Sequence, residues 1–371
     1  MHIVHTESSL GWGGQEIRII TEAAGMIARG HRVTLLTPSE APILNAAKSH
    51  GVETVALPIE KKTLKGLLSV SRWFAANPTV DIVNTHSSTD SWLIGLAAVF
   101  ARNFPSVVRT RHISAPVRDS LFNRWLYGHS ASRVVTTGEA LRRDLVERLQ
   151  LEENHVLSIA TGIDLRRFSR TNTPGRKEAR LTLGLPEGSF IVGIAATLRS
   201  WKGHDDLLSA FELLARDHAD LHLAIAGDGP RREHLERLIA ASPWSERIHM
   251  LGHRGDVPTV LAALDLFVLP SYANEGVPQA IMQAMAMELP VISTMVGAIA
   301  DAVLNGQTGV LLPPRDPQQL ASAIASLKND SDTYNAYASA GHKRAGEKFS
   351  LERMLDAMTG VFQEARASTR R

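Results

Sequence analysis

Short apolar segments alternate with longer amphipathic stretches along most of the chain. The first apolar segments read HIVHT, HRVTLLT, VETVALP, DIVNTH, SVVRTRH, RVVTT and HVLSIA, and helix-length stretches such as 14–29, 90–101 and 138–150 follow several of them. FIVGIAAT and LDLFVLPS are apolar without alternation, which is typical of strands buried on both faces. Strands that alternate with helices in this way predict parallel sheets covered by helices on both sides.

The alternation pauses once, at residues 166–188. This stretch is polar, contains Pro174, Gly175 and Pro186, and lacks a strand pattern, so we predict a linker with a short helix. A second series of strands and helices then runs from FIVGIAAT to TGVLLP, and residues 316–366 have a helical pattern.

A chain of 371 residues fits about two domains. We therefore expect an α/β protein with two Rossmann-like, doubly wound domains, at 1–168 and 169–348, followed by a terminal helix at 349–371. Ligands of such sheets bind beyond the carboxyl ends of the strands, so we expect function in a cleft where those ends of the two domains face each other.

Composition narrows the classes of function. The chain has no Cys, which excludes a disulfide scaffold, a thiolate zinc site, an iron–sulfur cluster and a Cys nucleophile, and fits a cytoplasmic protein. Its longest apolar run, 92–101, is shorter than the roughly 18–20 residues that span a bilayer. The start MHIVHTE has Glu7 where a signal peptide needs an apolar core. The net charge of +2 gives no indication of a nucleic-acid partner.

Basic residues concentrate in one part of the chain. Residues 60–133 carry ten Lys or Arg against four acidic residues, which leaves the rest of the chain net negative. Within that part, 61–74 and 102–127 mix cations with aromatic and aliphatic side chains, a combination that can dock on anionic lipid headgroups. An amphipathic helix whose apolar side is simply core explains 61–74 equally well. The docking hypothesis adds a possible peripheral location at the inner face of the membrane.

Glycines and cations follow the first predicted strand of each domain. In SSLGWGGQE, Gly13 and Gly14 precede a helix, where glycine lets a ligand approach the backbone and the helix amides attract phosphate. The spacing matches neither the dinucleotide nor the P-loop motif. In TLRSWKGHD, Arg199 and Lys202 can neutralise a pyrophosphate, although a solvated basic loop has the same composition. AGDGP, which contains Gly227, is a turn between a strand and a helix.

The most informative segment is LPSYANEGVPQAIMQAM. A strand ends at Pro270, Glu275 lies in the loop beyond it, and a helix is predicted to begin near Pro278. Gln279 and Ala280 then supply the next amides at the start of that helix, where an anionic phosphate is stabilised, and Gln279 and Gln283 share one helix face. Glu275 can accept hydrogen bonds from sugar hydroxyls.

Two histidines also lie at predicted strand ends, His86 in DIVNTHSS and His112 in VVRTRHIS. Evidence for a metal site is poor, because the chain lacks an H-E-x-x-H motif and its D-x-D at 330–332 has the position of a helix cap. We expect no metal and no cofactor.

Taken together and in order, these segments resemble the retaining GT-B glycosyltransferases of the group 1 or family-four class. The resemblance runs through the GG loop, TGIDLRRF (161–168), the Arg/Lys loop, GDGP, LGHRGDVP (251–258), the EGVP segment and GVLLPPRDP (309–317), and so covers nearly the whole chain. It implies two Rossmann-like domains, a nucleotide-sugar held mainly by the second, and a last helix that returns to the first. It also implies a UDP- or GDP-sugar donor, a saccharide or lipid-linked acceptor, and a role in lipopolysaccharide or cell-surface polysaccharide synthesis.

Carried over by position, the resemblance implies a role for each matching residue. His112 faces the reaction centre, Lys202 and Arg199 hold the pyrophosphate, and Glu275 binds the transferred sugar. The remaining donor-binding positions are Gly13, Gly14, His86, Gly227, His253, Arg254, Gly276, Val277, Pro278, Gln279, Ala280 and Gln283. Two positions depart from the family pattern: Gln283 stands where the family has a second Glu that binds ribose, and Thr197 stands where it has the Arg, so that Arg199 is the nearest substitute.

Other classes of protein stay open at this point. A nucleotide-sugar epimerase shares the expected fold and needs no acceptor. A non-catalytic nucleotide-sugar binder fits Gln283, but not the combination of His112, Lys202 and Glu275. A phosphorylase normally requires a pyridoxal lysine and a longer chain, and an NAD(P) oxidoreductase is disfavoured by the missing G-x-G-x-x-G.

Overall fold

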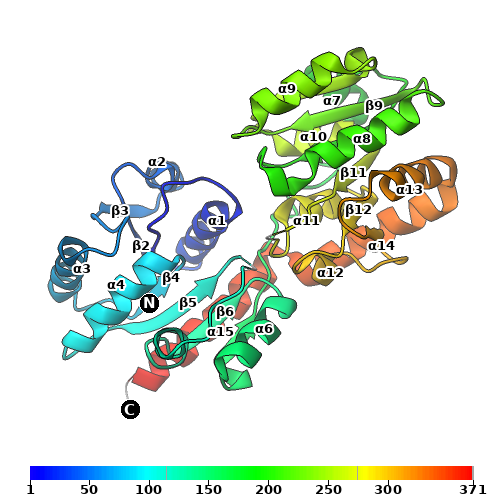
Figure 1. Ribbon diagram of the computed structural model, residues 1–371. Helices are drawn as coiled ribbons and strands as arrows, with labels where there is room; N and C mark the ends of the chain where they lie inside the picture. Colours follow the sequence, from blue (N-terminus) through cyan, green and yellow to red (C-terminus); the bar gives the residue numbers. More distant parts are fainter. Residues whose placement is uncertain (114, 274, 370–371) are drawn as a thin grey trace. The chain divides into compact units, whose positions relative to one another are not determined.

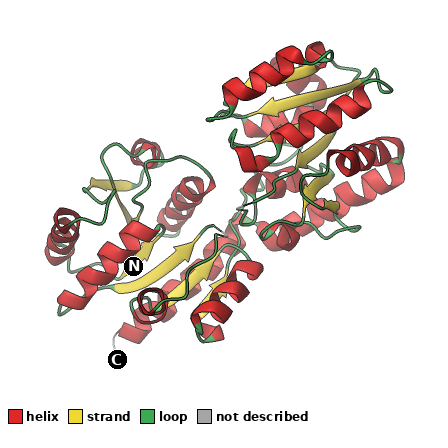
Figure 2. Ribbon diagram, in the orientation of Figure 1, coloured by secondary structure: helices red, strands yellow, loops and turns green. Residues whose placement is uncertain are grey.

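The computed structural model describes residues 1–113, 115–273 and 275–369, which form two compact units. One unit contains Met1–Gly162 together with Glu352–Arg371 (residues 370 and 371 lie outside the described part), and the other contains Ile163–Leu351. In both units parallel strands are flanked by helices (Figures 1 and 2). The predicted fold class, two Rossmann-like α/β domains, is therefore confirmed.

The first unit is built on a seven-stranded parallel sheet in the order β3-β2-β1-β4-β5-β6-β7. The strands are β1 (His2–Thr6), β2 (Arg32–Thr37), β3 (Glu53–Ala56), β4 (Ile82–Thr85), β5 (Ser106–Arg111), β6 (Arg133–Thr136) and β7 (Val156–Ser158). The helices are α1 (Gly14–Ala28), α2 (Pro42–Ser49), α3 (Leu64–Ala76), α4 (Ser88–Phe100), α5 (Leu121–Arg124), which continues into a π-helical turn at Trp125–His129, and α6 (Glu139–Leu149).

The second unit is built on a six-stranded parallel sheet in the order β10-β9-β8-β11-β12-β13. Its strands are β8 (Phe190–Ala195), β9 (Leu221–Ala226), β10 (Ile248–Gly252), β11 (Leu266–Leu269), β12 (Val291–Thr294) and β13 (Val310–Leu312). Its helices are α7 (Arg176–Leu183), α8 (His204–Ala215), α9 (Arg232–Ala241), α10 (Val257–Ala263), α11 (Gln279–Ala286), α12 (Ile299–Ala302), α13 (Pro317–Asn329) and α14 (Ser331–Phe349).

The final helix, α15 (Leu351–Thr369), packs on the first unit although it follows the second in sequence. Its apolar side chains Met358 and Phe362 are fully buried. Its rim is held by ion pairs, from Arg29 to Glu352 at 2.8 Å and from Arg366 to Asp81 at 2.8 Å. The chain therefore passes between the units twice, near Gly162 and near Leu351.

The strand order creates one switch point in each sheet. The order reverses between β1 and β4 in the first unit and between β8 and β11 in the second, so the loops after these strands leave toward opposite faces of the sheet. An open space at the carboxyl edge results, and this is where ligands of such sheets bind. The loops that follow β1, β4, β8 and β11 are therefore the places to look for a site in each unit.

No helix among residues 1–113, 115–273 and 275–369 is both long and apolar enough to cross a bilayer. The core of the first unit includes Val70 and Phe74 of α3 and Leu93 and Ile94 of α4. Part of the 61–74 stretch is thus ordinary core, as one of its two interpretations proposed. Leu64 and Leu68 of the same helix are exposed, at 71% and 44%.

Candidate functional site

A lysine and a glutamate meet at the switch point of the second sheet. Lys202 ends the turn after β8, and Glu275 lies in the loop after β11. Lys202 Nζ is 2.6 Å from Glu275 Oε1, and Ser271 Oγ donates to the same oxygen at 2.6 Å. Glu275 is only 4% exposed and Lys202 is half-buried. The structure thus brings together two side chains that lie 73 positions apart in the sequence.

Close backbone contacts fix the loops that carry this pair. Gly203 has φ +76°, and a Cβ there would lie 2.0 Å from the carbonyl oxygen of Pro270. Gly297 has φ +59°, and a Cβ there would lie 2.0 Å from the carbonyl oxygen of Glu275 itself. Only glycine fits these two positions, because a side chain would clash with the backbone of the loop that carries Glu275.

Short polar side chains complete the support of the Glu275 loop. Thr294, the last residue of β12, donates its hydroxyl to the carbonyl oxygen of Ser271 at 2.5 Å. The amide of Tyr272 donates to the carbonyl oxygen of Trp201 at 2.8 Å, which ties the Glu275 loop to the Lys202 turn. Because Ser271 and Thr294 are buried, these bonds are shielded from competing water.

Helix α11 begins four residues after Glu275, next to Pro278, where the sequence predicted a helix start. Pro278 is its N-cap, and Gln279 is its first residue. Ile281 and Met282 are buried in the core, whereas Gln279 and Gln283 are half-buried on another face. The start of the helix therefore lies four residues beyond the buried carboxylate that Lys202 contacts.

The other predicted donor-binding residues of the second unit are less concentrated. Arg199 is exposed, and its guanidinium lies 5.1 Å from the ring centre of Trp201. Gly227 has φ +147°, and a Cβ there would lie 1.9 Å from the carbonyl oxygen of Ala196, so this turn also requires glycine. His253 is exposed, and the Arg254 guanidinium is 2.7 Å from the carboxylate of Asp256.

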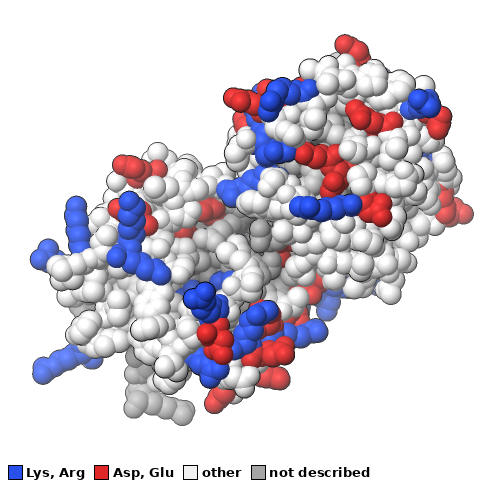
Figure 3. Space-filling view, viewed as in Figure 1, with Lys and Arg blue, Asp and Glu red and all other residues white. Residues whose placement is uncertain are grey.

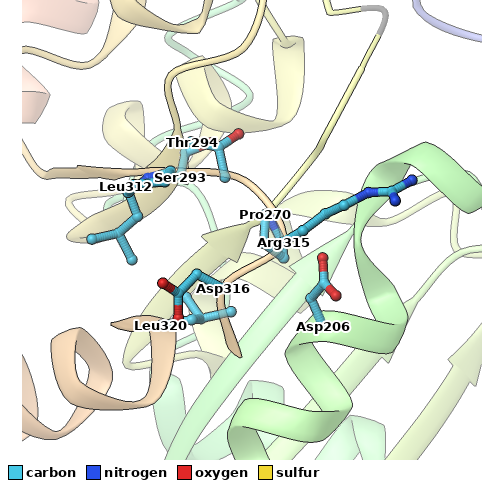
Figure 4. A pocket seen from close by; sticks show the side chains of 9 residues that line it. Asp206, Pro270, Ser293, Thr294, Leu312, Arg315, Asp316 and Leu320 are labelled. Atoms are coloured by element: carbon cyan, nitrogen blue, oxygen red, sulfur yellow. The ribbon is translucent and has the colours of Figure 1, made fainter. Parts of the chain in front are cut away.

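A small pocket lies beside these loops, and sequence reasoning did not anticipate it. Figure 4 shows Asp206 of α8 and the Arg315 side chain on one side of it and Thr294 and Leu312 on the other. The Arg315 guanidinium stacks over the ring of Tyr272 at 4.1 Å. Burial raises the pKa of Asp206, and Arg315 opposes that rise. A second cation thus contacts the loop that carries Glu275.

In the first unit, a buried carboxylate holds the glycine-rich loop after β1. Glu7 is fully buried; its Oε1 accepts the amide of Ser9 at 2.7 Å, and its Oε2 accepts the side-chain amide of Gln15. Gly13 is the N-cap of α1 and Gly14 its first residue. Burial, followed by the nearby Asp90, raises the pKa of Glu7 to about 8.

Three histidines form a hydrogen-bonded chain at the same edge of the first sheet. His5 Nδ1 is 2.9 Å from His86 Nε2, and His86 Nδ1 is 2.9 Å from His112 Nε2. His5 and His86 are buried and His112 is half-buried. The two histidines that the sequence placed at strand ends are therefore neighbours, and a third stands behind them.

A fully buried ion pair lies beneath the histidines. Arg18 and Glu22, one turn apart on α1, approach to 3.5 Å, and the Arg18 guanidinium donates to the carbonyl oxygen of Ile159 at 2.7 Å. Nearby, Asp90 accepts the hydroxyl of Thr6 at 2.6 Å and the amide of His86 at 3.0 Å. Burial raises the pKa of Asp90 despite these hydrogen bonds.

Sequence reasoning missed His5, Glu7, Arg18 and Glu22 as members of this network. His5 carries the same signal as His86 and His112, a histidine near the end of a buried strand, and could have been found by that signal. Arg18 and Glu22 have the spacing of an exposed helix pair, so only the packing of α1 reveals that they are buried. Within the described ranges, no group of three or more His, Asp or Glu side chains is arranged to hold a metal ion.

Comparison with known proteins bears on both units. Residues 12–167 match the family described as glycosyltransferase family 4, and residues 175–344 match the family described as glycosyl transferases group 1. A curated relative, the D-inositol 3-phosphate glycosyltransferase of Salinispora tropica, is 30% identical over 255 residues; the alignment covers 65% of this chain and 52% of that protein. The chain thus spans about half the length of this relative.

Two solved structures share the whole fold at lower identity. A glycosyltransferase from Rickettsia africae has a TM-score of 0.88 at 21% identity, with 98% of each chain covered. The Anabaena protein Alr3699/HepE, solved in complex with UDP, has a TM-score of 0.85 at 21% identity, with 98% of this chain and 100% of that chain covered. The two family matches follow one another along most of the sequence, one in each unit, so both units are similar to known glycosyltransferases and the second unit is similar to group 1.

Proposed function

We propose that this chain transfers a sugar from a nucleotide-sugar donor to a saccharide or lipid-linked saccharide acceptor. The observation that carries this proposal is the Lys202–Glu275 pair at the switch point of the second sheet, immediately before helix α11. The cation and the helix start offer partners for the diphosphate of such a donor, and the buried carboxylate offers a partner for its sugar.

Lys202 would bind the diphosphate. An ammonium has three donors, so Nζ can keep its contact with Glu275 and still donate to phosphate oxygens. Its charge would stabilise the negative charge that develops on the diphosphate as the bond to the sugar breaks. Arg199, on the same turn, would add a second cation from a more exposed position.

Glu275 would bind hydroxyls of the transferred sugar. Hydrogen bonds to a carboxylate are stronger than those to a neutral acceptor, and the buried position of Glu275 limits competition from water. The backbone amides of Gly276, Val277, Gln279 and Ala280, around the start of α11, would bind phosphate, since the helix dipole favours an anion there. Gln283 would bond the ribose through its amide.

The nucleoside would be uridine, because the Anabaena structural neighbour was solved with UDP and also with UDP-glucose. Gly227 follows β9, which is next to β8 in the sheet, and His253 and Arg254 follow β10, the edge strand beside β9; their backbone would contact the base. The chain's own residues supply cationic charge at the phosphate position, so we propose transfer without a metal. We also propose retention at the anomeric carbon, with His112 near the reacting sugar.

The first unit would receive the acceptor. The GG loop held by Glu7 follows β1 at the switch point of this sheet, and Ser8 at its start contacts Ser87, the residue after His86. In the segments that follow β3 and β5, the unit has an exposed surface that we call the basic–apolar surface, made of Lys61, Lys62, Leu64, Lys65, Leu68, Arg118, Leu121 and Phe122. Figure 3 shows Lys and Arg side chains projecting from the surface around α3.

This surface fits an anionic bilayer. Lys62 Nζ, just before α3, lies 5.3 Å from the ring centre of Trp92 of α4, and Trp92 contacts Phe122 of α5, so a cation and two aromatic side chains are contiguous here. Leu121 and Phe122 are 84% and 71% exposed. We propose that the chain binds the inner membrane face here and acts on lipid-linked acceptors, in lipopolysaccharide or cell-surface polysaccharide synthesis.

The test is acceptor-dependent release of nucleotide. Purified protein is incubated with UDP-, GDP- and ADP-sugars, with and without candidate acceptors that include D-inositol 3-phosphate and lipid-linked saccharides. We expect release of UDP that requires an acceptor, is unaffected by EDTA, and gives a product with the donor's anomeric configuration by NMR. Formation of a free, altered sugar without an acceptor would indicate an epimerase and contradict the proposal.

Glu275→Ala separates a transferase from a protein that only binds the donor. For a transferase, turnover should fall sharply while residual UDP binding persists. If no donor gives turnover with the wild-type protein and UDP still binds, the chain is a binder and the proposed transfer is wrong. Glu187→Ala, which changes an exposed carboxylate of the same unit, serves as the matched control.

A further inference from the structure

The histidine chain of the first unit has an inner end and an outer end. Its members come from three neighbouring strands or their loops, β1, β4 and β5, and its central member, His86, uses both ring nitrogens for the chain. Adjacent rings lie 5.1 and 5.2 Å apart, so the chain is continuous. His112 contributes Nε2 to the chain and therefore has Nδ1 as its second nitrogen for a ligand.

The inner end meets the buried ion pair. Among the described residues, His5 Nε2 has no hydrogen-bond partner, and Glu22 Oε1 lies 4.0 Å from it. Glu22 Oε1 accepts the side-chain amide of Asn84 at 3.3 Å, and Glu22 Oε2 lies 3.5 Å from Arg18 Nε. Glu22, Arg18 and His5 are all fully buried. The Glu22 carboxylate thus lies at the inner, buried end of the histidine chain.

All three imidazoles are kept neutral by their surroundings. Burial, and then the Arg18 charge, lowers the pKa of His5 to about 3, and burial is also the main cause of the low pKa values of His86 and His112. A neutral imidazole has one N–H donor and one acceptor nitrogen. The proton position on any one ring therefore fixes the positions on the other two, and only two arrangements of the chain exist.

The ion pair selects one of them. Burial raises the pKa of Glu22, and Arg18 and Asn84 oppose that rise. Because a buried guanidinium without a counterion is strongly unfavourable, the carboxylate stays ionised beside Arg18 and attracts an N–H at His5 Nε2. His86 Nε2–H must then donate to His5 Nδ1, and His112 Nε2–H must donate to His86 Nδ1.

We propose that Glu22, His5 and His86 are positioning residues that hold His112 in its Nε2–H tautomer, so that Nδ1 accepts a hydrogen bond from a substrate hydroxyl. The residue that holds one ring nitrogen of a histidine decides what the other can do. This inference rests on the proposed function for the statement that His112 meets a sugar. Its tautomer, however, can be measured without any substrate.

The first experiment records long-range proton–nitrogen NMR spectra of the full chain with 15N-labelled histidine at pH 7.5. Signals of the three rings are assigned from single-histidine variants. We expect His112 and His86 to show a protonated Nε2 and an unprotonated Nδ1. A protonated Nδ1 on His112, or a mixture of the two tautomers, would overturn the proposal.

Glu22→Gln tests the cause. A glutamine lacks the negative charge that favours an N–H at His5 Nε2, so we expect the Nδ1–H form of His112 to appear in the spectrum. Glu147→Gln, which changes an exposed carboxylate on α6, is the matched control and should leave the spectrum unchanged. If the Glu22 variant does not fold, the wild-type spectrum still decides the question.

Two variants of His86 test the consequence for turnover. Asparagine places its oxygen where His86 Nδ1 accepts from His112, whereas glutamine reaches only the Nε2 position that contacts His5. We expect His86→Asn to keep most of kcat, and His86→Gln to lose about tenfold to a hundredfold in kcat with a smaller change in donor KM. Equal turnover in both folded variants would overturn the proposal, whereas absence of transfer by the wild type would refute the proposed function and leave the NMR result standing.

Discussion

The two sheets end in different surroundings at their switch points. In the first unit, β1 ends in His5 and Thr6 and is followed by Glu7, and all three are fully buried. In the second unit, the corresponding strands end in apolar residues, such as Leu269 of β11, and the first buried carboxylate beyond it, Glu275, lies in the following loop. At its switch point, the first unit has a titratable group within a strand, whereas the second unit carries Lys202 and Glu275 on loops.

This difference predicts how substitutions in each unit affect folding stability and ligand binding. In the first unit, charge, hydrogen bonding and folding are coupled, because burying a titratable group changes its pKa and every such change appears in the stability. In the second unit, the strands end in apolar residues at the switch point and the site residues lie on loops. Changes to these loops should therefore alter ligand binding more than folding. Substitutions in the two units should therefore differ in whether they mainly change ligand binding or mainly change stability.

The largest effect is expected for Lys202→Ala in the second unit. Removal of the ammonium should lower kcat by about a hundredfold to a thousandfold, because a preorganised charge is lost where the leaving diphosphate forms. Turnover is measured as acceptor-dependent UDP release. Lys177→Ala, which removes a lysine from an exposed ion pair on α7, is the control and should not change kcat. A turnover that survives Lys202→Ala would remove this residue from the mechanism.

The second prediction concerns the basic–apolar surface of the first unit. Charge reversal of Lys61, Lys62 and Lys65 should weaken sedimentation with anionic vesicles by about 1 kcal/mol or more per residue, since each lysine is exposed. The matched control reverses Lys177, Lys343 and Lys348, three exposed lysines of the second unit. Equal loss in both triple variants would mean that total charge, and not this surface, governs binding to the vesicles.

The third prediction is that Gly297→Ala displaces the backbone of Glu275 in the second unit. The new Cβ would meet the carbonyl oxygen of Glu275, and alanine is strained at φ +59° by about 1–2 kcal/mol. We expect a lower kcat with a melting temperature that falls only slightly, because the loop can move without opening the sheet. Gly188→Ala, where a Cβ meets nothing within 4 Å, is the control for enzyme activity and melting temperature. Unaltered kcat in Gly297→Ala would show that the loop tolerates the displacement.

The fourth prediction is a pH dependence in the first unit. Because the folded-state pKa of Glu7 is about 8, above its ordinary value near 4.5, its contribution to stability is greatest at low pH and is lost as the pH rises toward 8. Glu7→Gln cannot ionise. The variant should therefore gain about 1.4 kcal/mol relative to the wild type for each pH unit between about 5 and 8.

Urea unfolding of wild type and Glu7→Gln at pH 5.5, 6.5 and 7.5 measures this difference. Glu147→Gln, an exposed carboxylate in the same unit, should show no such trend. A constant difference between Glu7→Gln and the wild type across the three pH values would mean that Glu7 is already ionised in the folded protein.

The sequence was sufficient for the fold class but not for all of the site. Continuous apolar strands such as FIVGIAAT required helices on both faces, and this periodicity is local, so it is readable from the sequence. The strand order, which places β1 beside β4 and β8 beside β11, depends on long-range packing and could not be read. The order matters because it brings Lys202 to Glu275.

The residues that were missed share a physical cause. Ser271 donates its hydroxyl to the Glu275 carboxylate, and Thr294 donates its hydroxyl to the carbonyl oxygen of Ser271. Such hydrogen bonds leave no pattern in the sequence. Arg18 and Glu22 look like a solvated helix pair until the packing of α1 buries them. Gly297 is one glycine among many, and only the position of the Glu275 backbone shows why it is needed.

The most direct test of the account is hydrogen–deuterium exchange of the full chain with and without saturating UDP. The account predicts slower exchange in the second unit, in the Lys202 turn and at the start of α11, and little change in the histidine chain of the first unit. Lys202→Ala should reduce the protection. Protection by UDP that is confined to β1, β4 and β5, or no protection anywhere, would contradict the claim that the Lys202–Glu275 site holds the donor.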